Sequence, residues 1–386
     1  MSLLFPPDPY GKPALSGLPL DELIEVLKPL PAFRGRQIFR WIAGGASAFE
    51  HMTNLPRSLR EELAGRFRVY SSAAAARFED PDGTVKLQIR LRDGARIEAV
   101  LLSDGGDGSS RRGDGPRKTA CLSTQAGCPA GCVFCKTGKL GFLRNLDSSE
   151  ITEQFLFLRG LVPGISNIVI MGMGEPLLNL EELRRALSVL TDSRGLGLSP
   201  RRITLSSSGI TAGIRDLADR GPGIRLALSL TTADGDLRQR LMPIGRANPL
   251  PELKEALRYY QRKGGGRITL EAVLLSGVNT RREDAAALIA FAKGLDAVVN
   301  LIPWNPIGGM EFEGKPLMEP SPKETGDFIR LLERGGLNVT RRFRRGRSIG
   351  GACGQLGALL PEEPGKKGLE KADEKPQQGA ENVYPF

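Results

Sequence analysis

The stretch Cys128-Pro-Ala-Gly-Cys132-Val-Phe-Cys135 says more about this chain than any other part of its sequence. Its three cysteines follow the spacing C-x3-C-x2-C, and no fourth ligand lies nearby. A structural zinc site takes four protein ligands, usually as paired C-x2-C units. A cubane iron–sulfur cluster has four irons, so three cysteines leave one iron open to another molecule. The spacing therefore predicts a cluster that binds a substrate or cofactor at its open iron.

Two structural alternatives stay open for this loop. The cysteines could be a half-formed zinc knuckle, but the only histidine in the chain, His51, lies far upstream. They could also be core residues, although a loop rich in Gly and Pro is a poor place for packing cysteines. The iron–sulfur interpretation is favoured over both.

Length and composition set the class of protein. The chain has 386 residues and 40% hydrophobic content, enough for one large domain and a small one. No apolar run reaches the roughly 18 residues of a membrane span. The first residues, Met1-Ser-Leu-Leu-Phe-Pro-Pro-Asp8, lack the pattern of a secretory signal, and five cysteines without a disulfide framework favour a reducing compartment. A cytoplasmic protein with no membrane partner is expected.

The charge distribution favours a polyanionic partner. The net charge is +10, although the last 26 residues carry six acids against four lysines. Positive charge is densest in Arg341-Arg-Phe-Arg-Arg-Gly-Arg347, where one aromatic ring lies among five arginines. Such a run can bind phosphates and stack on bases, and it can equally be a solvated charged edge.

The order of elements predicts several parts. Apolar periodicity and a proline at 56 predict a small helical accessory domain over residues 1–72. Alternating residues predict strands over 84–91 and 95–102 joined at Asp93-Gly94, within a β linker at 73–118 that includes a glycine-rich insertion. Residues 346–360 form a C-terminal cysteine segment, and the Lys/Glu/Gln-rich tail at 361–386 is expected to be disordered.

From residue 119 to 345 the pattern changes to repeated strand–helix units. Candidate strands are 119–123, 167–171, 202–206, 224–230, 267–275 and 298–302, with helix-like segments 148–159, 179–190, 251–263 and 282–293 between them. Six alternations predict a parallel α/β sheet with right-handed crossovers, either an open barrel or a doubly wound sheet. Ligands in such folds bind at the carboxyl ends of the strands, and the cysteine loop follows the first strand.

Three further features carry chemistry. Met171-Gly-Met-Gly-Glu-Pro176 follows the second strand, where glycines let a ligand approach the backbone and Glu175 supplies a negative charge. Cys121 lies on the first strand and could be an ordinary core residue. Cys353 is flanked by glycines just after the arginine run, which would lower its pKa and make it a reactive thiolate.

Several segments together make the chain resemble the RlmN/Cfr family of radical S-adenosylmethionine (SAM) RNA adenine methyltransferases. The resemblance spans roughly residues 15–360 and is nearer to the branch that methylates adenine C2 in 23S rRNA and tRNA than to the C8 branch. All five cysteines fall on family positions. The segments that carry it are Phe33–Ile42, Met52–Pro56, Cys121–Cys128, Cys135–Phe142, Met171–Leu178, Arg202–Ser206, Asn300–Pro306 and Ala352–Leu356.

The resemblance implies a partial (β/α)6 radical SAM barrel and roles for particular residues. Cys128, Cys132 and Cys135 would hold a [4Fe–4S] cluster whose open iron binds SAM. A first SAM would methylate Cys353, and a second would give a 5′-deoxyadenosyl radical that activates this methyl group for addition to adenine. Cys121 would release the product as a disulfide forms, and Glu98 would accept a proton. SAM contacts would come from Gly174, Glu175, Ser206, Ser229, Leu230, Thr231 and Asn305.

The same resemblance implies 23S rRNA (at the peptidyl-transferase centre) and tRNA as partners, an electron donor such as flavodoxin, and a monomer. The chain departs from the family pattern in three places. Thr231 stands where the family usually has histidine, Ser348-Ile-Gly-Gly351 replaces an acidic stretch, and the insertion at 104–116 lengthens the linker. The competing interpretations are C8 methylation and a non-catalytic iron–sulfur protein that binds RNA.

Overall fold

The computed structural model describes residues 11–103, 117–342 and 345–357. The insertion at 104–116, the tail at 361–386 and two residues of the arginine run, 343 and 344, lie outside the described residues. Within the described part no helix is long and apolar enough to cross a membrane.

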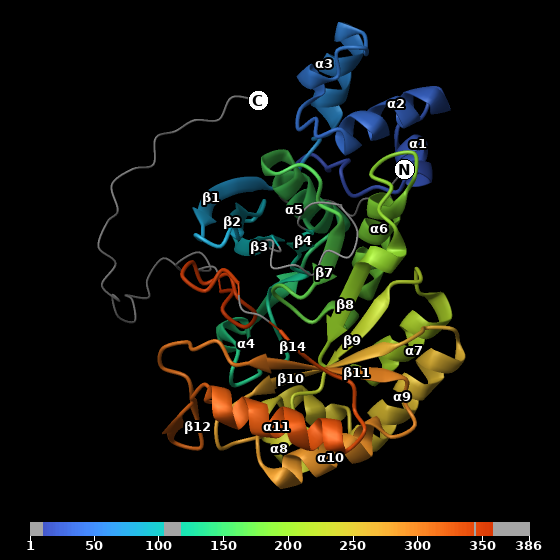
Figure 1. The fold of residues 1–386 in the computed structure, drawn as a ribbon. Coiled ribbons are helices and arrows are strands. Elements are labelled where there is room, and N and C mark those ends of the chain that lie inside the picture. The colour runs from blue at the N-terminus through green and yellow to red at the C-terminus, as the bar shows by residue number, and fades with distance from the viewer. Residues whose placement is uncertain (1–10, 104–116, 343–344, 358–386) are drawn as a thin grey trace, which may run out of the picture.

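Three helices build the N-terminal part of the chain, which lies at one end of the molecule (Figure 1). They are α1 (Leu20–Val26), α2 (Ala32–Ala43) and α3 (Arg57–Arg66), with the short turn η1 (Phe49–His51) between the last two. A proline precedes each helix, at positions 19, 31 and 56, where its fixed φ and missing N–H do no harm. Leu23, Ile38, Met52 and Leu63 are fully buried in a core of their own.

A sheet of ten described strands forms the body of the molecule. The antiparallel strands β1 (Ala73–Glu79), β2 (Val85–Arg90) and β3 (Arg96–Ser103) lead into β4 (Lys118–Cys121). From β4 onward the pairing is parallel and follows chain order. These strands are β7 (Asn167–Ile170), β8 (Ile203–Ser207), β9 (Arg225–Ser229), β10 (Ile268–Leu274), β11 (Ala297–Pro303) and β14 (Val339–Arg341).

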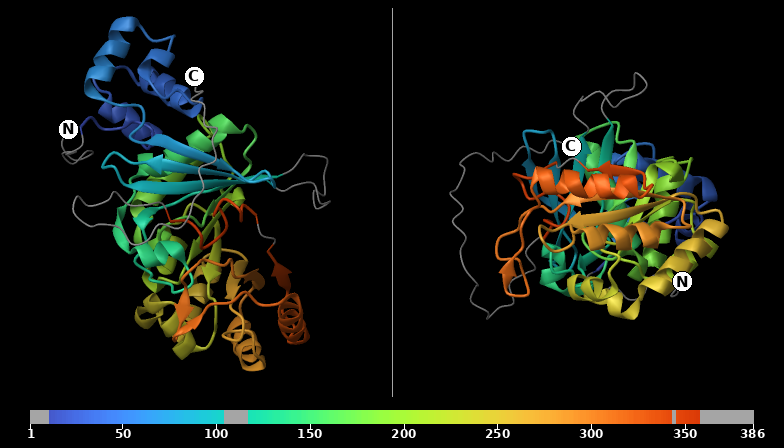
Figure 2. Two further views of the ribbon diagram at one scale, coloured as in Figure 1. Left: turned by 90° about the vertical axis from the view of Figure 1, so that its left-hand side faces the viewer. Right: turned by 60° about the horizontal axis from the view of Figure 1, so that its bottom comes forward.

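Helices connect the parallel strands and pack around the outside of the curved sheet, as the two turned views make clear (Figure 2). They are α5 (Ser148–Leu161), α6 (Leu180–Thr191), α7 (Thr211–Arg220), α8 (Gly235–Leu241), α9 (Leu250–Arg262), α10 (Arg282–Ala292) and α11 (Pro322–Arg334), with the short turns η2 (Pro176–Leu178), η3 (Pro200–Arg202) and η4 (Pro243–Ala247). Leucine, isoleucine and valine side chains of the strands meet the apolar faces of these helices in one large core.

The predicted radical SAM barrel is confirmed as an open, mostly parallel sheet with β1 and β14 at its two described edges. All six predicted strands are present, and the predicted helices agree with α5, α6, α9 and α10 to within about two residues. The pattern missed β14, because a strand of three residues has too few alternating positions to give a signal. The strands β1–β3, which come from the segment 73–118 expected as a β linker, pair onto β4 and extend the same sheet.

Candidate active site

The three cysteines of the C-x3-C-x2-C loop lie between β5 (Gln125–Gly127) and the short helix α4 (Lys136–Leu140). The strand β6 (Phe142–Asn145) pairs with β5 and closes the loop at its base. Gly127 has a φ of 77°, and a Cβ there would lie 2.0 Å from the carbonyl oxygen of Gly141. The N–H of Cys128 donates to the same carbonyl over 2.7 Å. Glycine is therefore needed for the loop to fold back on itself.

The surroundings of these thiols disfavour three bare thiolates. Burial raises the pKa of Cys128 to about 12, with a smaller contribution from Cys135. Burial also raises the pKa of Cys132 and of Cys135, and the neighbouring cysteines contribute to both shifts. Cations that bind the sulfur atoms would reverse this effect, because a coordinated thiol is deprotonated outright.

The donor set is three thiols without a fourth protein ligand, which suits a cluster with one open iron better than a closed zinc site with four protein ligands. Cys135 raises the pKa of both Cys128 and Cys132, so the three thiols lie near one another. Cys128, Cys132 and Cys135 thus suit the cluster that the sequence predicts.

The Gly-Glu-Pro turn after β7 packs directly against β5. Gly174 has a φ of 105°, and a Cβ there would lie 2.6 Å from the Cβ of Gln125. The N–H of Glu175 donates to Oε1 of Gln125 over 2.7 Å. The Glu175 carboxylate is buried and accepts from Ser208 N (2.7 Å), Ser208 Oγ (2.6 Å) and Leu177 N (3.1 Å). Burial nevertheless raises the pKa of Glu175 above its usual value.

The inner face of the curved sheet encloses a cavity of about 420 Å³. Alternate residues of β4 and β10 line it, Thr119 and Cys121 and then Thr269 and Glu271, since successive side chains of a strand point to opposite faces. Its lining includes Cys121 from β4, Glu271 from β10, Asn305 after β11, and Cys353. Two of the sequence-predicted reactive cysteines therefore face the same space.

The segment that carries Cys353 is tied to the cysteine loop. The N–H of Lys136, the residue after Cys135, donates to the carbonyl of Gly354 over 2.8 Å. The hydroxyl of Thr137 donates to the carbonyl of Leu356 over 2.6 Å. Asn305 Nδ2 donates to the carbonyl of Cys353 over 3.0 Å. Three contacts thus hold Cys353 between the cysteine loop and the end of β11.

Cys121 and Cys353 are free thiols here, as are the other three cysteines. The disulfide that the resemblance implies is therefore not present in this structure. Burial raises the pKa of Cys121 to about 12, and the nearby Cys353 adds to the effect. Cys121 is thus held in its protonated form at neutral pH.

Arg342, which follows β14, is a site residue that the sequence analysis did not single out. It lines the cavity, with Nη1 3.9 Å from Oε1 of Glu271 and 3.5 Å from the sulfur of Met171. The charge of Cys353 is the largest cause of a raised pKa at Arg342. The sequence left the arginine run open between a phosphate-binding surface and a solvated charged edge, yet this member lines the cavity that also contains the two thiols. The short strand β14 sets that direction, and it left no clear signal in the sequence.

Apart from Gly174 and Glu175, which lie in the turn after β7, the predicted SAM contacts fall into two groups. Ser206 Oγ lies 3.0 Å from Ser229 Oγ and 3.1 Å from Oε2 of Glu271. The N–H groups of Leu230 and Thr231 both donate to the carbonyl of Glu271, over 2.9 and 3.0 Å. Asn305 lies apart from these residues, beside Cys353.

Two buried polar atoms at this site have no hydrogen-bond partner within the described residues. They are Thr231 Oγ1 and Asn305 Oδ1. A buried polar atom without a partner costs about 1–3 kcal/mol unless a ligand satisfies it. The site therefore fits a polar molecule with donor groups, such as the ribose and amine of SAM.

Glu98 lies outside the cavity lining. Its buried carboxylate pairs with Lys86 Nζ over 3.0 Å and accepts from the N–H of Gly357 over 2.7 Å. It thus contacts the Cys353 segment from the side of β3.

Comparisons with known proteins agree with this geometry. Residues 122–289 match the family model of the radical SAM superfamily, and residues 15–69 match that of the ribosomal RNA large subunit methyltransferase N-terminal domain. A probable dual-specificity RNA methyltransferase RlmN of Treponema pallidum is 48% identical over 89% of this chain and 97% of its own length. A protein of the same description from Thermus thermophilus is 42% identical over 89% of this chain and 94% of its own length.

A solved structure extends the agreement to the fold. The crystal structure of a radical SAM methyltransferase from Sphaerobacter thermophilus superposes with a TM-score of 0.81. It shares 38% sequence identity and covers 89% of this chain and 99% of its own.

Proposed function

The chain belongs to the RlmN-type radical SAM RNA methyltransferases, and from this premise we propose that it methylates C2 of adenosine in 23S rRNA and in some tRNAs. The rRNA target is an adenosine of the peptidyl-transferase centre. One observation carries the proposal: Cys353 faces the same cavity as Cys121 and is tied by hydrogen bonds to the residues directly after Cys135. A methyl-accepting thiol, a second thiol and a cluster loop are the parts that this reaction needs.

The cofactors of the proposed reaction are a [4Fe–4S] cluster and SAM. Cys128, Cys132 and Cys135 would hold the cluster, and the proposed SAM contacts are Gly174, Glu175, Ser206, Ser229, Leu230, Thr231 and Asn305. When bound, they supply a methyl group from one SAM and a 5′-deoxyadenosyl radical from another. The unpartnered oxygens of Thr231 and Asn305 support a polar ligand at this position.

Each reactive side chain has a different role in the proposed reaction. Cys353 is the proposed methyl acceptor, and the guanidinium of Arg342 lines the same cavity. Cys121, held protonated by burial, is the proposed second thiol that releases the methylated RNA. Glu98 is the proposed proton acceptor, and its contact with the N–H of Gly357 connects it to the Cys353 segment.

The remaining parts of the proposal concern partners and organisation. Residues 1–72 are proposed as an accessory domain that binds RNA, 73–118 as a linker, 119–345 as the radical SAM core and 346–360 as the catalytic cysteine segment. The positive net charge supports an RNA partner. An electron donor such as flavodoxin and a monomeric, cytoplasmic enzyme complete the proposal.

The test is nucleoside mass spectrometry on RNA treated anaerobically with the reconstituted enzyme, SAM and a reductant. Unmodified 23S rRNA fragments and bulk tRNA serve as substrates, and 2-methyladenosine is the expected product. Detection of 8-methyladenosine would move the chain to the C8 branch. Cleavage of SAM without any methyladenosine would mean another substrate, and a full cluster without SAM cleavage would favour the non-catalytic alternative.

Two cysteine variants test the separate roles proposed for Cys353 and Cys121. Cys353→Ala should abolish methylation, because the acceptor sulfur is gone. Cys121→Ala should instead accumulate a covalent protein–RNA adduct, visible as a shifted band on a denaturing gel. An active Cys353→Ala enzyme would rule out the proposed mechanism.

A further inference from the structure

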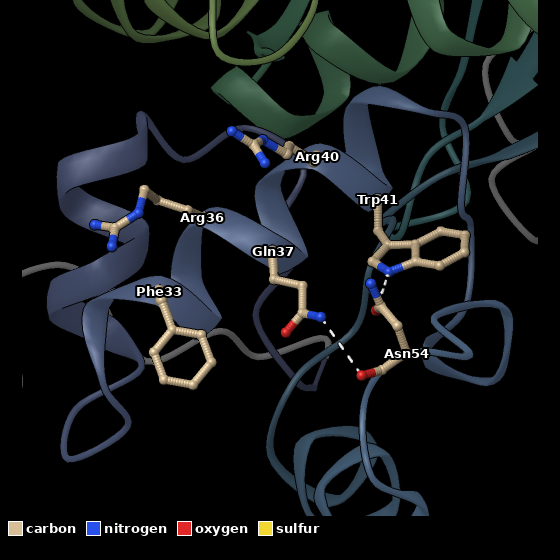
Figure 3. Close-up of a pocket in the computed structure, with 6 residues that line it drawn as sticks. All are labelled: Phe33, Arg36, Gln37, Arg40, Trp41 and Asn54. Carbon is tan, nitrogen blue, oxygen red and sulfur yellow. Dashed lines mark hydrogen bonds between the residues drawn. The ribbon is translucent and has the colours of Figure 1, made fainter.

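A second pocket lies on α2 (Figure 3), the helix in the N-terminal part of the chain at one end of the molecule (Figure 1). It shares no lining residue with the cavity between the strands. It has a volume of about 450 Å³, within the range of roughly 300–1,000 Å³ typical of small-ligand sites. Its lining consists of Phe33, Arg36, Gln37, Arg40, Trp41 and Asn54.

Helical spacing places five of these residues on one face of α2. Positions 33, 36, 37, 40 and 41 follow one another at intervals of three and one, the spacing of a single helical stripe. The opposite stripe, which contains Ile38, Phe39 and Ile42, is buried in the N-terminal core. The core accounts for the buried stripe, and the outer stripe faces away from it.

The outer stripe combines aromatic rings with uncompensated positive charge. Phe33 is 50% exposed, so its ring is open to a ligand. No acidic residue occurs in α2, and no carboxylate lines the pocket. Among the described residues, neither Arg36 nor Arg40 forms an ion pair. An anion brought to this pocket meets two cations and no competing carboxylate.

Hydrogen bonds fix the far wall of the pocket. Trp41 Nε1 donates to Asn54 Oδ1 over 2.6 Å, and Gln37 Nε2 donates to the Asn54 carbonyl over 3.4 Å (Figure 3). These two contacts tie α2 to the loop before α3 and set the plane of the indole ring. Phe33 lies at the other end of the pocket, with the Arg34 guanidinium 4.8 Å from its ring centroid.

We propose that this pocket binds an unpaired nucleotide of the RNA, with its base stacked on Phe33 and its phosphates beside Arg36 and Arg40. The proposal rests on the proposed function in so far as RNA is the substrate. Proteins recognise single-stranded RNA by stacking splayed bases on aromatic rings and by contacts of arginine with the backbone. Charge complementarity favours a nucleic acid over an apolar protein partner here.

The first experiment measures RNA affinity by fluorescence anisotropy with the reconstituted full-length enzyme. The probes are a labelled tRNA anticodon stem-loop, which has unpaired bases, and a blunt RNA duplex, which has none. Phe33→Ala should weaken stem-loop binding about tenfold, in line with the loss of one base stack, and leave duplex binding unchanged. Phe33→Trp should keep the affinity and Phe33→Leu should lose it, because leucine retains apolar volume without a π face.

The second experiment measures the salt dependence of stem-loop binding. Arg36→Ala/Arg40→Ala should reduce the slope of log K against log salt by about 1.4, since each lost phosphate contact on a single strand contributes about 0.7. The control Arg201→Ala/Arg246→Ala removes two exposed arginines from η3 and η4 and so changes the net charge equally. It should leave the slope near that of the unaltered enzyme.

Three results would overturn the proposal: no loss of stem-loop affinity in Phe33→Ala, an equal loss with the duplex, or equal slopes for the two arginine pairs. Methylation is not part of either readout. An enzyme that made no methyladenosine but lost stem-loop affinity in Phe33→Ala would refute the proposed function and keep this inference.

Discussion

At the scale of single residues, Thr231 combines a β-branched side chain with a left-handed backbone conformation. Its φ is +61°, a region that β-branched residues rarely adopt. The protein holds it there with two backbone contacts: its N–H donates to the Glu271 carbonyl, and its own carbonyl accepts from Asn279 Nδ2 over 2.9 Å. Histidine, which the family resemblance implies at this position, tolerates positive φ better than threonine.

Thr231→His should therefore leave methylation activity unchanged or higher and should not raise the KM for SAM. The reason is that histidine releases part of a backbone cost of about 1–3 kcal/mol. Thr231→Val is the matched control, since valine keeps the branched Cβ and removes only the unpartnered hydroxyl. A large loss of activity in Thr231→His would mean that the site has been rebuilt around threonine.

At the scale of elements, the turn between β1 and β2 holds the segment that carries Cys353. Oδ1 of Asp80 and Oδ1 of Asp82 accept N–H groups within the turn itself. Oδ2 of Asp80 accepts from Ser348 N (3.0 Å) and Ser348 Oγ (2.6 Å), and Oδ2 of Asp82 accepts from Gly346 N (2.8 Å). Ser348 lies in the stretch where the family resemblance implies acidic residues. In this structure the carboxylate comes instead from Asp80, which accepts hydrogen bonds from Ser348.

Asp80→Asn/Asp82→Asn should slow methylation about tenfold or more while leaving RNA affinity and cluster content unchanged. The amides accept hydrogen bonds more weakly, so the Cys353 segment is held less firmly, and small misplacements of a reacting group are costly. The control is Glu79→Gln at the end of β1, where the carboxylate pairs with Arg77 instead. Equal rates in the double variant and the control would show that this turn does not position Cys353.

At the scale of the whole molecule, one buried carboxylate joins the N-terminal helices to the core. Glu153 of α5 accepts from Ser16 Oγ over 2.6 Å, just before α1. It also accepts from the N–H groups of Ser71 (2.7 Å) and Ser72 (2.8 Å), just after the helical part ends. The segments that precede and follow the N-terminal helices thus both bind the Glu153 carboxylate.

The stability of this junction should depend on pH. Burial raises the pKa of Glu153 to about 7 from its ordinary value of 4.5, although the serine donors oppose the shift. Between these pH values the folded chain keeps a proton that the unfolded chain has lost. The free energy of unfolding therefore falls as pH rises through this window and levels off above about 7.

Glu153→Gln removes this titration. Relative to the variant, the unaltered chain should lose up to about 3 kcal/mol of unfolding free energy between pH 4.5 and 7. Urea unfolding across that range measures the difference, with the exposed Glu61→Gln on α3 as the control. Parallel curves for the unaltered chain and Glu153→Gln would contradict the assignment.

The sequence by itself determined the fold class, the family and the cysteine loop. These depend on local spacing: three cysteines within eight residues, strand and helix periods, and glycines at turns that need positive φ. Only the tertiary structure decided that Thr137 meets Leu356 across 219 residues, that Arg342 faces the thiols, and that Asp80 and Asp82 hold the Cys353 segment. The physical reason is that side-chain directions and long-range hydrogen bonds follow from how the sheet curves, which no local pattern encodes.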